Sequence, residues 1–145
     1  MKCLLQCVTQ ASVTVAGVVV GEIDQGLLVL VGVEPEDAEQ TVTRVAERLL
    51  RYRVFADAEG KMNLNVAQVQ GSILLVSQFT LAADTASGNR PGFSTAAPPE
   101  QASNLCDQLA DALRKGDVRV ETGRFGTDMQ VALVNDGPVT FLLEA

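Results

Sequence analysis

Two short polar segments hold the residue types that could act on a substrate. The first is Ser77-Gln78-Phe79-Thr80-Leu81, which directly follows the apolar run Ile73–Val76. Hydroxyl, amide and backbone N–H groups at the end of a buried strand can bind a carbonyl and stabilise negative charge that develops on its oxygen. Ser77 and Thr80 also suit a simpler role in ending the strand or starting a turn. The composition of this segment alone favours the structural role.

The second segment is Asn135-Asp136-Gly137-Pro138-Val139-Thr140. Asn, Asp, Gly and Pro are the usual turn residues, so the segment by itself predicts a hairpin turn between two strands. Gly137-Pro138 is also one of the few dipeptides that can adopt a cis peptide bond at low cost. Considered alone, the segment is best interpreted as a turn.

The composition excludes several kinds of site. The 145 residues include no His and no Trp, and only one Tyr. A Ser-His-Asp triad, a Cys-His pair and a His-ligated metal are therefore excluded. The net charge of −7 argues against non-specific binding to DNA or RNA, which depends on many contacts between Lys or Arg and phosphates. Any RNA partner must be held locally, in a small pocket.

The three cysteines show no pattern typical of a disulfide or a metal site. Cys3 and Cys7 would lie on one face of a strand, about 13 Å apart at ~3.3 Å per residue, which is too far for a disulfide. Cys106 falls on the apolar face of a predicted helix. We expect three reduced thiols in a cytosolic protein.

The elements that must position the two segments are strands and two helices. No apolar run reaches the ~18 residues of a membrane span, and the start of the chain turns polar too early for a signal peptide. We expect one domain over residues 1–145 in which helices pack against a mixed β-sheet, an α/β fold. Helices are predicted from near Pro35 and from Pro98-Pro99 to Lys115-Gly116. Strands are predicted at Lys2–Val8, Ser12–Val15, Val18–Ile23, Leu27–Val33, Val54-Phe55, Ile73–Val76, Val118–Glu121, Met129–Val134 and Val139–Leu143.

Taken together, the two polar segments resemble a known family. They match the signature motifs SQFTL and NxGPVT of the D-aminoacyl-tRNA deacylases. Other segments resemble that family in the expected order: Ala11–Val15, Gly26–Leu30, Gly60–Leu64, Asn89-Arg90-Pro91, Thr122–Phe125 and Asp128–Val131. The resemblance covers nearly the whole chain. It implies the compact family fold of mixed sheets and helices, in a homodimeric cytosolic enzyme without metal or organic cofactor.

The resemblance also implies an activity and a site. Such an enzyme hydrolyses the ester between a D-amino acid and the terminal adenosine of tRNA, with Ser77, Gln78, Phe79 and Thr80 as catalytic residues. Gly137-Pro138 is expected to be cis and to reach into the partner's pocket, where its carbonyls block an L side chain. Glycine, which has no Cβ, should pass this gate. No membrane or DNA partner is implied.

For the chemistry we expect attack by water, because no His and no evident Lys activates Thr80 as a nucleophile. Backbone N–H groups near Phe79 and Thr80 would stabilise the oxyanion, and the 2′-hydroxyl of the tRNA would assist. Phe125 and Met129 are candidate walls for the terminal adenosine, although a place in the core of a strand pair fits them nearly as well.

Two positions depart from the family pattern. Cys7 stands where the family carries an Arg that braces the Gly-Pro element, and Gly92 stands where Ser is common. Two other functions stay open: a non-catalytic nucleic-acid-binding protein, and a related deacylase that clears glycine or an L-residue. The charge of −7 and the absence of a basic tail after Ala145 favour the enzyme.

Overall fold

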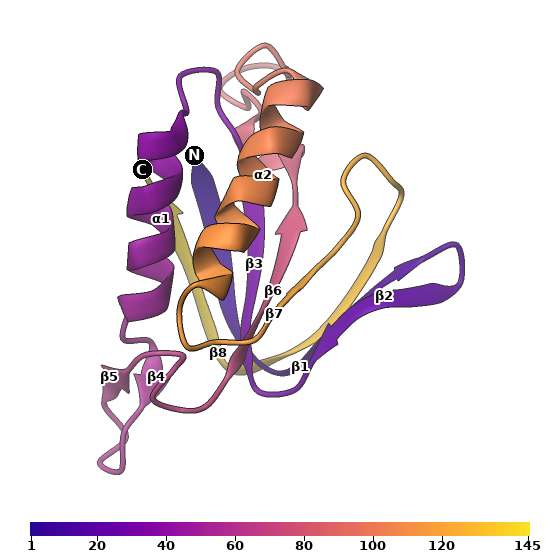
Figure 1. The fold of residues 1–145 in the computed structure, drawn as a ribbon. Coiled ribbons are helices and arrows are strands. Elements are labelled where there is room, and N and C mark those ends of the chain that lie inside the picture. Colours follow the sequence, from indigo (N-terminus) through magenta and orange to yellow (C-terminus); the bar gives the residue numbers. More distant parts are fainter.

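A six-stranded mixed sheet forms the centre of the molecule, and both helices cover one of its faces (Figure 1). The computed structural model describes residues 1–145. In chain order the elements are β1 (Lys2–Val15), β2 (Val18–Ile23), β3 (Gly26–Gly32), α1 (Glu39–Arg51), β4 (Phe55–Ala56), β5 (Met62–Leu64), β6 (Ser72–Ser77), a 3₁₀ turn η1 (Phe79–Ala82), α2 (Pro99–Arg114), β7 (Val120–Thr122) and β8 (Gln130–Glu144). The expected α/β fold, a mixed sheet with two helices, is confirmed.

Strands β3 and β6 form the middle of the sheet because both of their faces are apolar. They are parallel neighbours, in register from Gly26 opposite Ser72 to Val31 opposite Ser77. Alternate side chains enter a 25-residue cluster under the helices and a 7-residue cluster on the other face of the sheet. Continuous apolar runs are typical of parallel strands buried on both faces. The resulting order β2-β1-β3-β6-β7 places the polar end of β6 at the middle of one sheet edge.

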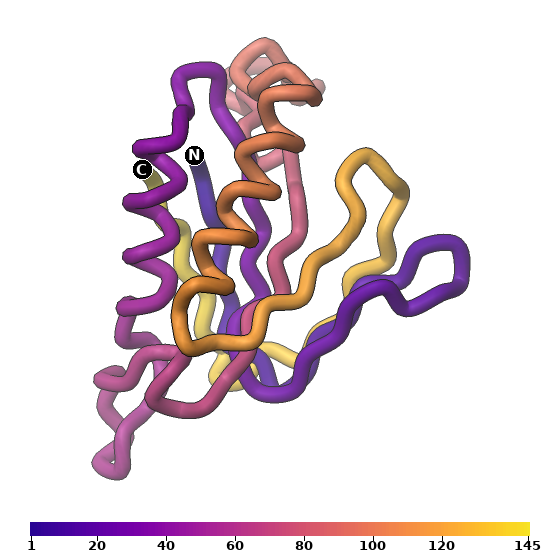
Figure 2. Tube along the Cα trace, in the orientation of Figure 1, coloured from indigo at the N-terminus to yellow at the C-terminus, as the bar shows by residue number.

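Strand β1 is one continuous element, so the prediction of separate strands at Lys2–Val8 and Ser12–Val15 is wrong. Its first half pairs with β3 and its second half with β2. A register irregularity between Val8 and Gln10 lies at the change of partner. Bulges bend a strand and increase its twist, which lets one strand serve two parts of a sheet. Figure 2 shows β1 and β8 following each other along this curve.

Strand β8 is also continuous, and the hairpin turn expected at 135–138 is wrong. Residues on both sides of it pair antiparallel with β1, Asn135 with Val8 and Thr140 with Gln6. The four residues Asp136–Val139 therefore stand opposite Cys7 alone, and we call them the Gly-Pro bulge. Asn135 closes the bulge, because its Oδ1 accepts from the N–H of Val139 at 2.7 Å and its Nδ2 donates to Thr140 Oγ1 at 2.8 Å. The chain bulges here and does not reverse.

Helix α1 begins at Glu39, later than the predicted start near Pro35. The preceding turn binds the α-ammonium of Met1, which lies 2.6 Å from Asp37 Oδ1 and 2.7 Å from Glu34 Oε2. Asp37 thus serves the buried ammonium and not the helix dipole. Neither helix has the length and apolarity that crossing a membrane would require.

Candidate active site

The polar end of β6 opens into a cavity of about 830 Å³. Three of the predicted site residues from this segment line it, Ser77, Gln78 and Phe79. Phe125 and Met129, expected from the resemblance, lie on the same cavity. The complete lining is Val76, Ser77, Gln78, Phe79, Phe93, Ser94, Ala96, Ala97, Pro98, Pro99, Ala102, Phe125, Gly126, Thr127, Asp128, Met129 and Val131. The structure therefore brings together residues that are up to 55 positions apart in the chain, from Val76 to Val131.

The loop of residues 83–98 closes over the end of β6 and is fixed by backbone hydrogen bonds. Asp84 and Gly92 bond to each other through both main-chain groups, at 2.8 and 2.9 Å, and the N–H of Ala97 donates to the carbonyl of Val33 at 2.9 Å. Gly32 allows the 3₁₀ turn to approach β3, because a Cβ there would lie 2.8 Å from the Cβ of Leu81. The loop and the 3₁₀ turn beside the cavity are thus fixed to the end of β3 and the residue that follows it.

An aromatic pair stands at the cavity. The rings of Phe79 and Phe93 are 5.2 Å apart between centroids and tilted by 56°. Both side chains are exposed, at 55% and 46% of their surface. An exposed aromatic pair beside hydroxyl and amide groups suits a ligand with a flat, partly apolar portion, since such rings offer stacking surface.

Thr80 lies on the 3₁₀ turn and is exposed, but it is not among the residues that line the cavity. Its Oγ1 accepts a hydrogen bond from Nε2 of Gln78, which does line the cavity. An amide N–H cannot remove a proton from a hydroxyl. Asp128 is the one lining residue with an ionisable side chain, and no Lys lines the cavity. The hydrogen bond from Gln78 supplies Thr80 with an orienting partner, and that amide cannot act as its general base.

The 3₁₀ turn also supplies backbone N–H groups. The N–H of Gln78 is used by the carbonyl of Val31 at 2.7 Å, and that of Leu81 by the carbonyl of Gln78 at 3.1 Å. The N–H groups of Phe79 and Thr80 lie between them, at the start of the turn, where a helical segment has no preceding carbonyl to accept them. Such free donors are suited to bind a developing oxyanion.

Phe125 and Met129 differ in how far they belong to the core. Phe125 is exposed at 37% of its surface and lies in the turn after β7. Met129 is half-buried and packs against the smaller apolar cluster while it also lines the cavity. Gly123 lets it pack closely, because a Cβ there would meet Met129 Sδ at 2.8 Å. The interpretation as strand-pair core therefore fails for Phe125 and holds in part for Met129.

Gly137 and Pro138 do not line this cavity, although the peptide bond between them is cis, as the resemblance implied. Both residues are exposed on the Gly-Pro bulge. Gly137 has φ +147°, and a Cβ there would lie 2.5 Å from Val139 Cγ2. Only glycine fits this position readily. Within one chain the two signature motifs are thus not brought together.

Cys7, which stands in place of the family's Arg, lies opposite the Gly-Pro bulge but points into the core. It is 3% exposed, and its Sγ donates to the carbonyl of Val54 at 3.5 Å. Burial, with a smaller effect of the Asp136 charge, raises the pKa of the Cys7 thiol to about 11. Burial likewise raises the pKa of Cys3 to about 12 and that of Cys106 to about 11. All three thiols are free, and none has the low pKa of a nucleophile.

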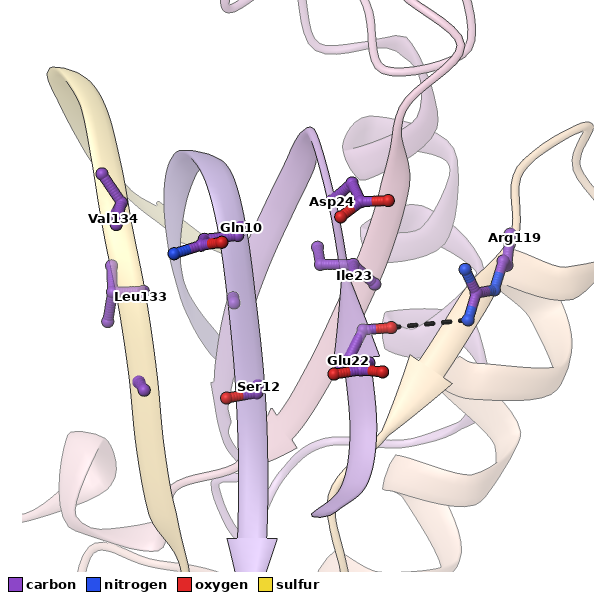
Figure 3. A pocket seen from close by; sticks show the side chains of 10 residues that line it. Gln10, Ser12, Glu22, Ile23, Asp24, Arg119, Leu133 and Val134 are labelled. Carbon is purple, nitrogen blue, oxygen red and sulfur yellow. Dashed lines mark hydrogen bonds between the residues drawn. The ribbon is translucent and has the colours of Figure 1, made fainter.

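A second, smaller cavity of about 420 Å³ lies between β1, β2 and β8 (Figure 3). Arg119 points toward it, with Nη2 donating to the carbonyl of Glu22 at 3.4 Å and to Glu121 Oε1 at 2.9 Å. Neither signature motif lines this cavity. No group of three or more His, Cys, Asp or Glu side chains could hold a metal ion. The absence of a metal and of any cofactor stays a prediction.

Comparisons with known proteins agree with the family resemblance and with the observed fold. The family model of D-Tyr-tRNA(Tyr) deacylase matches residues 4–144. D-aminoacyl-tRNA deacylase of Pseudomonas paraeruginosa (strain DSM 24068 / PA7) is 62% identical over 144 residues, 99% of each chain. The enzyme of the same name from Escherichia coli O1:K1 / APEC is 60% identical over 144 residues, again 99% of each chain.

Two solved structures share the fold. The c-Myc DNA Unwinding Element Binding Protein has a TM-score of 0.94 and 41% identity, over 100% of this chain and 99% of the other. A probable eukaryotic D-amino acid tRNA deacylase has a TM-score of 0.82 at 18% identity, over 98% of this chain and 97% of the other, which shows the fold alone.

These matches first define a class, the hydrolases that cleave the ester of aminoacyl-tRNA. Within it the chain belongs to the D-Tyr-tRNA(Tyr) deacylase family, and the ester that it hydrolyses joins a D-amino acid to tRNA.

Several lining residues were not foreseen from the sequence. Phe93 and Ser94 line the cavity, yet both stand in a segment predicted only as a loop; Asp128 belongs to the family-like segment Asp128–Val131 but was not predicted as a site residue. The one signal in the sequence was Phe93, a large apolar residue within a loop rich in Gly, Ser and Pro. Binding residues are disproportionately carried on loops, so an aromatic residue in this loop is a candidate for a binding surface.

Proposed function

We propose that the cavity at the end of β6 binds the 3′-terminal aminoacyl-adenosine of tRNA and that the enzyme proofreads chirality in translation. It removes D-amino acids and glycine and rejects L-aminoacyl-tRNA. The observation that carries this proposal is the position of Ser77, Gln78 and Phe79 on a cavity of about 830 Å³, a volume within the usual range for a small-molecule site. Because tRNA is aminoacylated in the cytoplasm, we expect the enzyme to act there.

The reaction needs little activation, because an aminoacyl ester is already reactive. Water adds to the carbonyl carbon, and the oxyanion that forms accepts hydrogen bonds from the N–H groups of Phe79 and Thr80. The bond from carbon to the ribose oxygen then breaks, that oxygen takes up a proton, and free amino acid and tRNA are released. Thr80, held by the Gln78 amide, orients these groups, and the neighbouring 2′-hydroxyl of the tRNA assists the proton transfer.

For the choice between D and L substrates we assign the Gly-Pro bulge of a partner subunit. The bulge is exposed, and Gly137 and Pro138 lie outside their own chain's cavity, which supports a role in trans. Gly137 has no Cβ, so its carbonyl can approach the α-carbon of the substrate. An L side chain would meet this backbone, a D side chain would point away, and glycine would pass.

A homodimer is needed for this arrangement, and the free edge of the sheet supports one. β8 pairs with β1 only, so its second edge is unpaired along the strand. Val134 and Leu142 on this strand are exposed at 47% and 49%. Natural proteins usually cover a long apolar edge, and a second copy of the chain would do so here.

A DNA-binding role is the competing function, because one structural neighbour carries that description in its name. The net charge of −7 disfavours it, since DNA affinity depends on many cationic contacts. A duplex DNA that binds in the nanomolar range at physiological salt would support the alternative.

The decisive experiment compares hydrolysis of D-Tyr-tRNA, L-Tyr-tRNA and Gly-tRNA by the purified protein. We expect rapid hydrolysis of the D-ester, slower hydrolysis of the glycyl ester and almost none of the L-ester. Equal rates on the D- and L-esters would refute the proposed selectivity.

The cavity is tested with Ser94→Trp, which places an indole in it from an exposed position. Asn104→Trp, on the exposed side of α2, is the matched control. Loss of activity in Ser94→Trp alone supports the site. Full activity in Ser94→Trp would show that the ester is cleaved elsewhere.

A further inference from the structure

Several cationic residues of this acidic chain lie close together in one segment. Of its 11 Lys and Arg residues, four lie within residues 44–53, which contain a single acidic residue, Glu47. They are Arg44, Arg48, Arg51 and Arg53, and all four are exposed. The chain as a whole carries −7. A locally positive surface is therefore present in a protein that must bind a polyanion.

Three of these arginines line a groove of about 540 Å³, here called the arginine groove. It is lined by Glu47, Arg48, Arg51, Tyr52, Arg53, Val54, Met62 and Phe141. Its aromatic wall is ordered, because the rings of Tyr52 and Phe141 meet edge to face with centroids 6.1 Å apart. The groove is thus a formed surface with charged side chains around an apolar wall.

The guanidinium groups of the arginine groove are largely free of protein partners. Arg48 donates to the carbonyl of Glu144 at 3.2 Å and lies 5.8 Å from the centroid of the Tyr52 ring. Arg51 and Arg53 make no side-chain hydrogen bond, and none of the three takes part in an ion pair. The helix dipole explains cations in the last turn of α1, but Arg53 lies beyond the helix end at Arg51.

The groove adjoins the Gly-Pro bulge. Val54 lines the groove, and its carbonyl accepts from Sγ of Cys7, the residue directly opposite the bulge. Phe141, on the other wall, follows the bulge by two residues on β8. In the dimer proposed above, a bulge that enters the partner's cavity brings its own arginine groove to the mouth of that cavity.

We propose that the arginine groove binds backbone phosphates of the tRNA whose 3′ end occupies the partner's cavity. The inference rests on the proposed function and extends it to the rest of the substrate. Guanidinium groups match phosphate geometry with paired N–H donors, which is why arginine is favoured at such contacts. The acidic remainder of the protein would repel RNA, so this groove also sets the orientation in which tRNA approaches.

The test separates phosphate binding from ester hydrolysis with two substrates. One is D-Tyr-tRNA, and the other is 3′-O-(D-tyrosyl)adenosine, which keeps the ester and the base but has no phosphate. For Arg51→Gln/Arg53→Gln we expect KM for the tRNA substrate to rise about 10-fold or more with kcat unchanged. Hydrolysis of the adenosine ester should stay at the wild-type rate. The salt dependence of log(kcat/KM) should lose a slope of about 1.4 to 1.8, or about 0.7–0.9 per lost phosphate contact.

Arg119→Gln is the matched control, an exposed arginine beside a different cavity. An unchanged KM for tRNA in the double variant would overturn the proposal. So would an equal loss on the adenosine ester, which would show an effect on the cavity or the fold, or an equal effect of Arg119→Gln.

Direct binding keeps the test independent of the proposed chemistry. Affinity for uncharged tRNA, measured by fluorescence anisotropy, should fall in the double variant even if the wild type hydrolyses no D-ester. If the wild type hydrolysed no D-ester but the double variant still lost tRNA affinity, the proposed function would be refuted and the groove would remain supported. A DNA duplex of equal phosphate number that bound as tightly as tRNA, with the same dependence on Arg51 and Arg53, would contradict the assignment to tRNA.

Mixed dimers show which subunit's groove serves a cavity. One chain carries Arg51→Gln/Arg53→Gln and an open cavity, and the other carries Ser94→Trp and a wild-type groove. If the groove serves the partner's cavity, the one open cavity has a wild-type groove beside it and KM for tRNA returns to the wild-type value. A KM that stays high would contradict the arrangement in trans.

Discussion

Replacement of Gly137 by alanine tests the Gly-Pro bulge as the chiral gate. The residue has φ +147°, and a Cβ would lie 2.5 Å from Val139 Cγ2 and 2.9 Å from the backbone nitrogen of Val139. A non-glycine residue held in such a conformation costs about 1–3 kcal/mol. At 1.36 kcal/mol per factor of ten, the native geometry of the bulge becomes about 5- to 150-fold less populated.

The assay is kcat/KM for D-Tyr-tRNA and L-Tyr-tRNA. We expect their ratio to fall by a factor in the same range, because the displaced carbonyl no longer blocks the L side chain. The fold should persist, since the bulge is exposed and its neighbours on β8 remain paired with β1. Gly92→Ala is the control, because a Cβ there meets only atoms of Asp84 at 3.8 and 3.9 Å. A D-to-L ratio within twofold of wild type in Gly137→Ala would refute the gate.

Mixed dimers extend this test to the role in trans. One chain carries Gly137→Ala with an open cavity, and the other carries Ser94→Trp with an intact bulge. If the bulge serves the partner's cavity, the only open cavity receives a normal bulge and full selectivity returns. Selectivity that stays low in the mixture would show that each bulge serves its own chain.

Four further predictions concern single groups. Thr80→Ser should keep nearly full activity and Thr80→Ala should lose about 3- to 10-fold, as for one orienting hydrogen bond, and a trapped acyl-Thr80 species would instead establish a nucleophile. Cys7→Arg, opposite the bulge, should raise the ratio of D- to L-ester hydrolysis because it restores the brace of the family pattern, and an unchanged ratio would contradict that role. The thiols of Cys3 and Cys7, which are buried, and of Cys106, which is half-buried, have pKa values raised to about 11 or 12 and should not react with a disulfide reagent at pH 8 until the protein is unfolded; one fast thiol would contradict this. Burial alone would lower the pKa of the Met1 ammonium. The carboxylates of Asp37 and Glu34 raise it by more than burial lowers it, so the pKa lies above its ordinary value of 8.0. Its contribution to stability is therefore complete below about pH 8 and is lost as the pH rises through the folded-state pKa; urea unfolding should show this loss, and Asp37→Asn should reduce it.

Much of the fold and part of the site could be predicted from the sequence. The apolar runs Leu27–Val31 and Ile73–Val76 indicated central strands, because an unbroken apolar stretch is stable only where both faces are covered. The helical stripes located α1 and α2, with an error at the start of α1. The cavity at Ser77-Gln78-Phe79 was located by the family motif, because the composition of this segment alone favoured a strand end or a turn.

Other features depended on contacts between distant parts of the chain. Asn135–Thr140 has the composition of a turn, and only its pairing with β1 on both sides makes it a bulge in a continuous strand. The prediction of two separate strands within β1 was wrong for the same reason, because the pairing partners of a strand are not encoded in its own residues. Phe93 lies at the cavity because backbone hydrogen bonds close its loop between Asp84 and Gly92 and join it to Val33, the residue after β3.

The sequence by itself determined which residues are apolar, which are charged and where a backbone without a side chain is available. That was sufficient for the strands, the helices and the family motifs. The tertiary structure decided that Ser77 and Phe125 share a cavity while Gly137 lies outside it, and that three arginines share a groove with Phe141 of β8. The physical reason is that strand register and loop closure are set by long-range hydrogen bonds and packing, which no local pattern of residues specifies.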